Sequence, residues 1–206
     1  MKVLDFATGA YWRHANEEDR LDLYRVCVET GDSGQDATPL FNLPDMLGEV
    51  FVGPYLTFEP NYAFALINEG ISGYLLATID TANFESKLQD SWWPALQSKY
   101  AAIDNSLFTS EECGILKFIN SPEVTDVEVT SQFPSQIHID LLPRSQGAGY
   151  GKAMMKYTLE LLAKNGSPGV HLHVSPTNER AFHFYQGLGF TLAHKFDDDW
   201  LMIRSL

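Results

Sequence analysis

The sequence has few cysteines, few basic residues and no long apolar segment. Cys27 and Cys113 are the only cysteines in 206 residues, and they form neither a CxxC pair nor a metal-binding spacing. So few thiols exclude a disulfide-stabilised secreted scaffold and favour two buried, reduced cysteines. No segment approaches the roughly 20 apolar residues of a membrane-spanning helix, and the first residues lack the apolar run of a signal peptide. We therefore expect a soluble, cytoplasmic protein that does not enter a membrane.

Basic residues are outnumbered by acidic ones. The chain has 14 Lys and Arg against 27 Asp and Glu, a net charge of −13. Such a surface repels phosphate backbones, which argues against a nucleic-acid partner. It favours cationic small molecules or basic peptides, although acids that only maintain solubility would give the same balance. The surface is compatible with a monomer or a homodimer.

The distribution of apolar residues predicts a mixed α/β sheet. We expect strands at residues 11–15, 62–67, 71–80, 136–142, 169–175, 191–196 and 200–205. We expect helices at residues 16–31, 44–51, 84–100, 110–120, 147–166 and 178–189. Strands that alternate with helices, with a hairpin before and after them, predict a mixed sheet of six to seven strands flanked by helices. The length fits a single domain, residues 1–206, with a helical insertion at about 82–130.

The first predicted helix has signals at both ends. Asn16 is a favourable N-cap residue, and acidic residues follow it in the first turn. Leu21, Tyr24 and Val28 recur at the spacing of a buried helical stripe, and Gly31 is a typical C-terminal stop.

Three glycines, Gly147, Gly149 and Gly151, stand at the start of the helix predicted at residues 147–166. A helix N-terminus has unpaired N–H groups and a partial positive charge, and glycine lets a phosphate approach the backbone closely. The spacing fits neither a P-loop, since Ala153 follows Lys152, nor the GxGxxG of dinucleotide-binding folds.

Two segments resemble motifs of the GNAT superfamily of acyl-CoA N-acyltransferases. Gln146-x-x-Gly149-x-Gly151 is similar to motif A, and SPTNERAFHFYQGLGF (175–190) is similar to motif B. The motif B positions that match are Asn178, Ala181, Phe184, Tyr185, Gly189 and Phe190. One helix and one strand separate the two motifs, as in the family. The resemblance implies a GNAT fold in which two strands splay apart at the CoA site.

A narrower resemblance runs over nearly the whole chain. CVETGDSGQDATPLF, GPYLTFEP, SWWP and IHIDLLPRSQGAGYG resemble bacterial relatives of the C-terminal acetyltransferase-like domain of O-GlcNAcases. The eukaryotic domain is generally regarded as a pseudo-acetyltransferase, whereas the glycine loop of this chain is complete. The resemblance implies an acetyl-CoA-dependent N-acetyltransferase that acts on a primary amine by direct attack in a ternary complex. A catalytically inactive module that binds CoA or a protein is the alternative.

The same resemblance implies a set of cofactor-binding residues. The N–H groups of the glycine loop would hold the pyrophosphate, and the strand edge at 139–142 would pair with pantetheine. Asn178 would lie beside pantetheine, or cap a helix, or do both. The implied residues are Leu141, Leu142, Gln146, Gly147, Ala148, Gly149, Tyr150, Gly151, Lys152, Asn178, Ala181 and Tyr185.

Three residues are candidates for catalysis. Tyr185 matches the tyrosine that protonates the departing thiolate in many GNAT enzymes, although it would also suit an aromatic core. His138 and Asp140 alternate on one strand, and His171 and His173 alternate on the next, so each pair shares a face. These groups suit a general base (His138 or Asp140), a structural His–Asp network or a metal site. We expect no resident metal.

The acceptor pocket is less clearly indicated. Asp32, Asp36, Tyr55 and His173 are candidates for binding a small-molecule or peptidyl amine. The two aspartates are equally suited to forming turns, and Trp92 and Trp93 are expected to pack in the core. A polyamine, an aminoglycoside-like molecule, an amino sugar and a lysine side chain all fit the negative charge.

Overall fold

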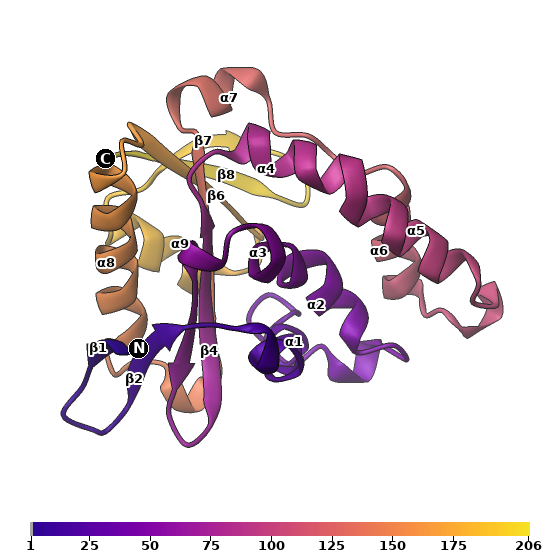
Figure 1. The fold of residues 1–206 in the computed structure, drawn as a ribbon, viewed down its shortest axis with the longest axis horizontal. Coiled ribbons are helices and arrows are strands. Elements are labelled where there is room, and N and C mark those ends of the chain that lie inside the picture. Colours follow the sequence, from indigo (N-terminus) through magenta and orange to yellow (C-terminus); the bar gives the residue numbers. More distant parts are fainter. Residues whose placement is uncertain (1) are drawn as a thin grey trace.

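A single eight-stranded sheet organises the fold in the computed structural model, which describes residues 2–206 (Figure 1). The strand order is β1-β2-β3-β4-β5-β6-β8-β7. Only β5 and β6 are parallel; the other neighbours are antiparallel. The strands are β1 (Lys2–Asp5), β2 (Tyr11–His14), β3 (Ala63–Ile67), β4 (Ile71–Thr78), β5 (Ser135–Leu141), β6 (Gly169–Val174), β7 (Thr191–Lys195) and β8 (Trp200–Ser205).

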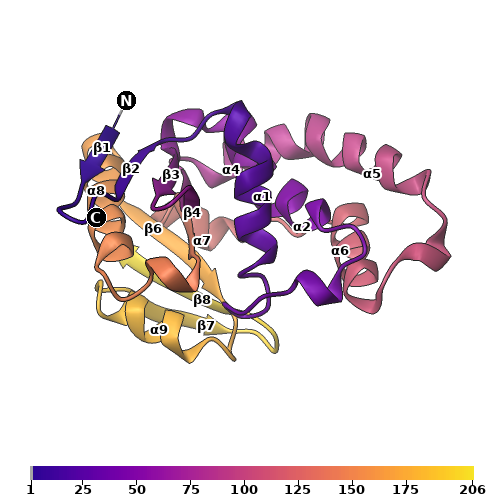
Figure 2. The same ribbon diagram turned by 90° about the horizontal axis from the view of Figure 1, so that it is seen from below.

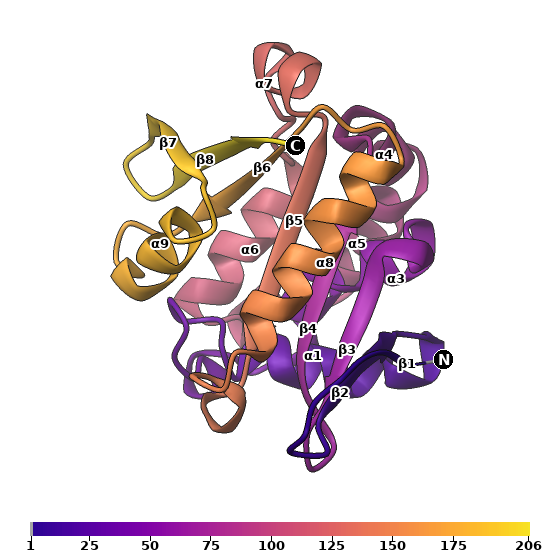
Figure 3. The same ribbon diagram turned by 90° about the vertical axis from the view of Figure 1, so that its left-hand side faces the viewer.

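Helices cover both faces of the sheet. They are α1 (Arg20–Val28), α2 (Asp45–Phe51), α3 (Gly53–Phe58), α4 (Thr81–Lys87), α5 (Trp93–Ala101), α6 (Ser110–Asn120), α7 (Val127–Gln132), α8 (Tyr150–Lys164) and α9 (Glu179–Gln186). Figure 3 shows α8 across one face and α1, α3, α5 and α6 behind the other. Figure 2 shows α5 and α6 extending away from the sheet. Within residues 2–206, no helix combines the length and apolar character needed to cross a membrane.

The two faces of the sheet carry two separate hydrophobic cores. Under α8, the core includes Trp12, Leu75 and Met154, which are fully buried. On the opposite face, the core includes Leu23 and Tyr74. Because successive side chains of a strand point to opposite faces, each central strand contributes to both cores.

The seven expected strands and the mixed sheet are confirmed. The structure adds β1 as an eighth strand, which pairs with β2 as an edge hairpin. The short helices α3 and α7 were also not predicted. Each has six residues, too short to show a helical period in the sequence.

The buried stripe predicted for the first helix is partly wrong. Asn16 does cap the chain, as predicted, at the start of a short 3-10 turn that leads into α1. However, Leu21 is 69% exposed. The buried residues of α1 are Leu23, Tyr24, Val26, Cys27 and Val28, so Tyr24 and Val28 of the predicted stripe are buried and Leu21 is not. The stripe is therefore rotated, because α1 packs against α2 and β4 and these neighbours decide which side faces inward.

The helix expected at residues 84–100 is divided into α4, a π-helical turn (Leu88–Trp92) and α5. Pro94 lies in the first turn of α5. Proline has no N–H to donate to the preceding turn, and its ring clashes with the carbonyl four residues earlier. A widened turn at this point accommodates the proline without ending the helical run.

Two helical glycines provide a matched test of the packing. A Cβ on Gly48 of α2 would lie 2.2 Å from the Tyr24 ring, whereas a Cβ on Gly114 of α6 meets nothing within 4 Å. We expect Gly48→Ala to destabilise the fold by about 1–3 kcal/mol through overpacking. Gly114→Ala should stabilise it by about 0.5–1 kcal/mol, because alanine loses less backbone entropy in a helix. Urea denaturation measures the free energy of unfolding of both variants. An unchanged free energy of unfolding in Gly48→Ala would contradict the close contact between α1 and α2.

Candidate functional site

The central feature of the site is the separation of β5 from β6. The two strands pair only at Ser135 with Val170 and at Gln136 with His171. Beyond that point β6 continues alongside β8, and Figure 3 shows β5 and β6 diverging. The expected splayed strand pair is therefore present.

The unpaired edge of β5 presents specific backbone groups. The N–H of Leu142 donates to the carbonyl of Ser72 (2.9 Å), so this residue is turned toward β4. Because hydrogen-bonding direction alternates along an antiparallel pair, Ile139 and Leu141 direct their backbone groups toward the opening. Of the two leucines implied as cofactor-binding, Leu141 thus faces the opening and Leu142 is buried on the other side.

The loop after β5 is anchored at both ends. Ser145 is fully buried, and its hydroxyl bonds that of Ser72 (2.9 Å) and the amide of Asn68 (2.9 Å). At the start of α8, the hydroxyl of Tyr150 bonds Thr8 (2.6 Å) and its carbonyl accepts from the indole of Trp12 (3.1 Å). Tyr150 is therefore a structural anchor through its side chain, and only its backbone N–H remains available to the loop.

The glycines have two distinct functions. Gly147 (φ 76°) and Gly149 (φ 84°) are left-handed, and a Cβ on either would meet nothing within 4 Å. They therefore shape a loop that is open toward solvent. A Cβ on Gly151, in contrast, would lie 3.0 Å from the Leu141 side chain, so this glycine allows α8 to approach β5 closely.

Six consecutive backbone N–H groups lie in this loop and in the first turn of α8. Within residues 2–206, the N–H groups of residues 147–152 have no hydrogen-bond acceptor. They lie at the N-terminus of a 15-residue helix, where the helix dipole adds positive potential. Gly147, Ala148, Gly149 and Lys152 are exposed. This arrangement can hold a phosphate or pyrophosphate group.

The start of α9 forms the opposite wall of the opening. Asn178 caps α9, since its side-chain oxygen accepts from the N–H of Ala181 (3.1 Å). The turn after α1 contacts this wall, where the hydroxyl of Ser33 bonds those of Thr177 (2.8 Å) and Ser175 (3.2 Å). A cleft of about 550 Å³ lies here, bordered by Ser33, Gly34, Gln35, Pro143, Gln146, Thr177, Asn178, Glu179 and Arg180.

Gln146 joins the two walls of the cleft. Its amide donates to the carbonyl of Leu141 (2.6 Å), and its side-chain oxygen accepts from Arg180 of α9. Gln146, which the motif resemblance singled out, thus spans the space between the end of β5 and the start of α9. Sequence reasoning missed Arg180 and Ser33, although Arg180 stands inside the motif B segment as a cation in an acidic chain.

Tyr185 of α9 is almost completely buried among Phe184 and Phe190. No hydrogen bond holds its hydroxyl within residues 2–206. Burial raises the pKa of this hydroxyl, and the nearby Asp140 carboxylate raises it further. Tyr185 therefore keeps its proton at neutral pH.

His138 and Asp140 lie on the face of β5 opposite α8. His138 Nε2 is 2.8 Å from Asp140 Oδ2, and the hydroxyl of Tyr74 donates to the same oxygen (2.5 Å). Both β5 side chains are partly exposed, at 35% and 26%. The structure thus contains a His–Asp network, which also remains suited to act as a base. Tyr74 was missed because an apolar strand gives no signal for one functional hydroxyl.

The histidines of β6 form separate interactions. His171 is fully buried, and its Nδ1 donates to the carbonyl of Phe133 (2.7 Å). Burial lowers the pKa of His171 to about 4. His173 is more exposed and bonds Asp199 in the loop between β7 and β8. No group of three or more His, Cys, Asp or Glu in residues 2–206 is placed to hold a metal ion, so the metal alternative lacks a ligand set.

The predicted acceptor residues are dispersed. Asp36 is exposed and accepts from the N–H of Thr38 (2.8 Å), and Asp32 forms a tight turn with Gln35. Neither aspartate is among the residues that border the cleft, and both take part in turns. Tyr55 is buried, and its hydroxyl donates to Gln136 (2.6 Å) near the point where β5 and β6 separate. Of the four, only His173 is both exposed and part of a strand that borders the opening, namely β6.

The two tryptophans pack in the helical layer, as expected. Trp93 is buried against Phe118, and the indole of Trp92 donates to the carbonyl of Glu49 (2.9 Å).

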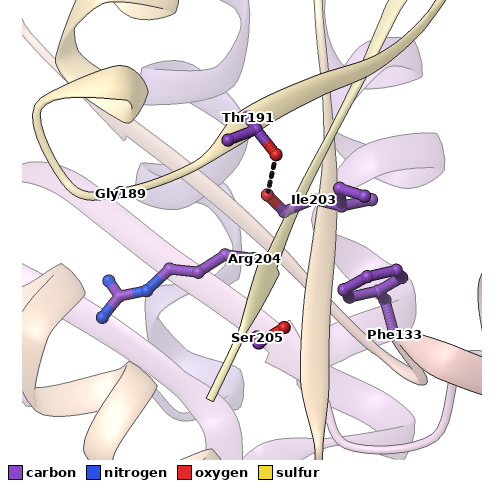
Figure 4. Close-up of a pocket in the computed structure, with 6 residues that line it drawn as sticks. All are labelled: Phe133, Gly189, Thr191, Ile203, Arg204 and Ser205. Atoms are coloured by element: carbon purple, nitrogen blue, oxygen red, sulfur yellow. Dashed lines mark hydrogen bonds between the residues drawn. The ribbon is translucent and has the colours of Figure 1, made fainter.

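A second, smaller hollow of about 350 Å³ lies at the other end of the sheet (Figure 4). Figure 4 shows Phe133 and Ile203 on one side of β8 and Arg204 on the other. Arg204 already donates to the carbonyl of Leu188 (2.5 Å). Ser205, which also borders the hollow, pairs with Gly169 at the closed end of the β5–β6 opening. This hollow is therefore remote from the glycine loop.

Known proteins resemble this chain in sequence and in fold. Residues 118–190 match the model of the acetyltransferase (GNAT) family. Protein O-GlcNAcase from Rattus norvegicus is 34% identical over 174 residues, which is 84% of this chain; the chain spans only 19% of that relative's length. The crystal structure of SsHAT is 31% identical, with a TM-score of 0.86 over 95% of this chain and 98% of that chain.

A more distant structure shares only the fold. PaiA N-acetyltransferase from Thermoplasma acidophilum, in complex with coenzyme A, is 12% identical, with a TM-score of 0.54 over 96% of this chain and 99% of that chain.

Buried His171 makes a testable contribution to pH-dependent stability. Its pKa is about 4 in the fold, against 6.5 for an ordinary histidine, so the unfolded chain takes up a proton that the folded chain does not. The contribution of His171 to the free energy of unfolding should be fully present above pH 6.5. It should fall by up to about 3 kcal/mol as the pH decreases toward 4. Urea denaturation across this range should show a smaller loss in His171→Gln.

The exposed His194 on β7 provides the control. We expect His194→Gln to keep the wild-type pH dependence. If the free energy of unfolding changed equally with pH in the wild type and in His171→Gln, the assignment of this pH dependence to His171 would be wrong.

Proposed function

Because the chain belongs to the acetyltransferase (GNAT) family, we propose that it transfers the acetyl group of acetyl-CoA to a primary amine. The observation that carries the proposal is the row of unpaired N–H groups at residues 147–152, next to the open edge of β5. Any helix leaves its first N–H groups unpaired, but here the exposed loop residues 147–149 add three donors to those of the first turn of α8. A pyrophosphate satisfies them, which supports cofactor binding over the inactive alternative.

The cofactor fits the opening in extended form. The N–H groups at 147–152 hold the pyrophosphate. Ile139 offers its N–H and carbonyl to the amides of pantetheine, whereas Leu141 offers its N–H, since its carbonyl already accepts from Gln146. Asn178 caps α9 through its oxygen, and its amide nitrogen, which lies beside Gly34 at the border of the cleft, is left to bind the cofactor. That a distant structural relative is described in complex with coenzyme A supports this choice of ligand.

The proposed chemistry uses residues on both sides of the opening. Acetyl-CoA supplies an activated acetyl thioester. The His138–Asp140 pair removes a proton from the acceptor ammonium, so that the neutral amine can attack the thioester carbonyl in a ternary complex. Tyr185, whose raised pKa keeps it protonated, gives its proton to the departing sulfur. The amide nitrogen then loses its second proton to water, and solvent restores the Tyr185 hydroxyl.

The acceptor is a cationic small molecule or a peptidyl amine. The net charge of −13 attracts such a molecule over a long range. Locally, Asp140 provides a carboxylate on β5, and Asp199 provides one in the β7–β8 loop, where it bonds His173 of β6. Direct attack also requires the amine to reach the thioester from this polar face of β5.

Cofactor binding can be tested with a matched pair of glycine variants. Gly149 and Gly166 lie at opposite ends of α8, both have left-handed backbones (φ 84° and 94°), and an added Cβ on either would meet nothing within 4 Å. We expect Gly149→Trp to weaken acetyl-CoA binding by about 100-fold or more in titration calorimetry. Gly166→Trp carries the same backbone strain and should bind like the wild type. Wild-type protein that fails to bind acetyl-CoA would favour the inactive alternative.

The role of Tyr185 can be tested by removing its hydroxyl. In Tyr185→Phe we expect kcat to fall by about 100- to 10,000-fold, because the leaving sulfur loses its acid, while the KM for acetyl-CoA changes little. Tyr157→Phe is the control: this tyrosine of α8 packs against Phe64, is partly buried, and should keep full activity when its hydroxyl is removed. Steady-state release of free CoA thiol measures both. Full activity in Tyr185→Phe would show that another group donates the proton.

A further inference from the structure

A buried hydroxyl on β4 holds the partly exposed His–Asp pair on β5. Tyr74 and Asp140 are directly opposite each other in the antiparallel ladder. The Tyr74 ring is fully buried, and its hydroxyl lies 2.5 Å from Asp140 Oδ2. His138 Nε2 lies 2.8 Å from the same oxygen. One carboxylate oxygen therefore receives two hydrogen bonds, one from each neighbour.

The direction of the Tyr74 hydrogen bond follows from its surroundings. Burial raises the pKa of Tyr74 well above its usual range, and Asp140 and the Cys27 thiol raise it further. Burial also raises the pKa of the Cys27 thiol, which lies beside the Tyr74 hydroxyl, to about 12. Tyr74 therefore keeps its proton. Since a carboxylate only accepts, the hydroxyl must donate to Asp140.

The same reasoning determines the tautomer of His138. Asp140 Oδ2 accepts, so Nε2 of His138 must be the nitrogen that carries hydrogen. In a neutral imidazole the lone pair is then on Nδ1. No hydrogen bond to His138 Nδ1 occurs within residues 2–206, and 35% of this side chain is exposed. Nδ1 of His138 and Oδ1 of Asp140 are thus the atoms of the pair that have no partner within residues 2–206. Of the two, the imidazole nitrogen is the stronger base.

We propose that His138 Nδ1 is the base for the acceptor amine, that Asp140 fixes the His138 tautomer, and that Tyr74 is a positioning residue that holds Asp140. The proposal rests on the proposed acetyl transfer for the first of these roles only. The ammonium N–H bond breaks as the Nδ1–H bond forms, and the Asp140 carboxylate balances the resulting imidazolium. His138 returns this proton to solvent after the product leaves.

The positioning role can be tested without any activity. Two-bond ¹H–¹⁵N correlation spectra of the free protein report the tautomer of each imidazole, and the spectrum of His138→Gln identifies the His138 signals. We expect a single Nε2–H tautomer in the wild type and a mixture of both tautomers in Tyr74→Phe, because the carboxylate is then free to rotate. An Nδ1–H tautomer in the wild type would overturn the proposal, as would an unchanged tautomer in Tyr74→Phe.

Tyr100→Phe is the matched control for these spectra. Tyr100 is also buried, and its hydroxyl also lies 2.5 Å from a carboxylate oxygen, that of Glu49, but it belongs to α5. Its loss should destabilise the protein as Tyr74→Phe does and leave the His138 tautomer unchanged. If the loss of a buried hydroxyl changed the His138 tautomer only through general destabilisation, Tyr100→Phe would change it as much as Tyr74→Phe.

Kinetics then test the base. With an accepted amine, His138→Gln should lower kcat by about 100-fold or more, and Tyr74→Phe by about 10-fold, with the KM for acetyl-CoA unchanged in both. Added imidazole should restore part of the activity of His138→Ala. Full kcat in His138→Gln would overturn the base assignment. If no amine is acetylated, the proposed function and the base fail together, and the spectra still decide the positioning of His138 by Tyr74 and Asp140.

Discussion

The separation of β5 from β6 after Gln136 is the constraint on which the rest of the structure depends. An unpaired strand edge inside a sheet leaves backbone donors and acceptors without partners, which is unfavourable unless water or a ligand satisfies them. The edge persists because β6 follows β8 along its whole length and diverges from β5 with it, while the start of α9 borders the cleft. The contacts of Ser33 with Ser175 and Thr177 brace that side from the turn after α1.

The glycine loop depends on the same separation. The loop begins where β5 ends, and Gly151 allows α8 to lie directly on Leu141. Ser145 and Tyr150 anchor the loop on both sides, so its left-handed glycines are held in place rather than left flexible. A rigid cradle of N–H groups binds an anion without first losing conformational entropy.

Strand β5 combines structural and chemical functions through its alternation. Ile137, Ile139 and Leu141 pack under α8, while His138 and Asp140 point to the other face. Charged groups on that face are tolerated because they are paired and partly solvated. The cofactor edge and the proposed base are therefore placed at a fixed distance by a single strand, with Tyr185 across the opening.

Local patterns in the sequence were sufficient to determine seven of the eight strands, the glycine loop, the cap at Asn178 and the shared face of His138 and Asp140, because each depends on residues close together in the chain. Only the tertiary structure decided what these groups contact. Tyr74 meets Asp140 through the register of β4 with β5, and Asp199 meets His173 through the fold of the β7–β8 loop. The exposure of Leu21 has the same origin, since neighbouring elements decide how α1 is turned. Contacts between distant segments follow from packing and register, which no single segment of the sequence contains.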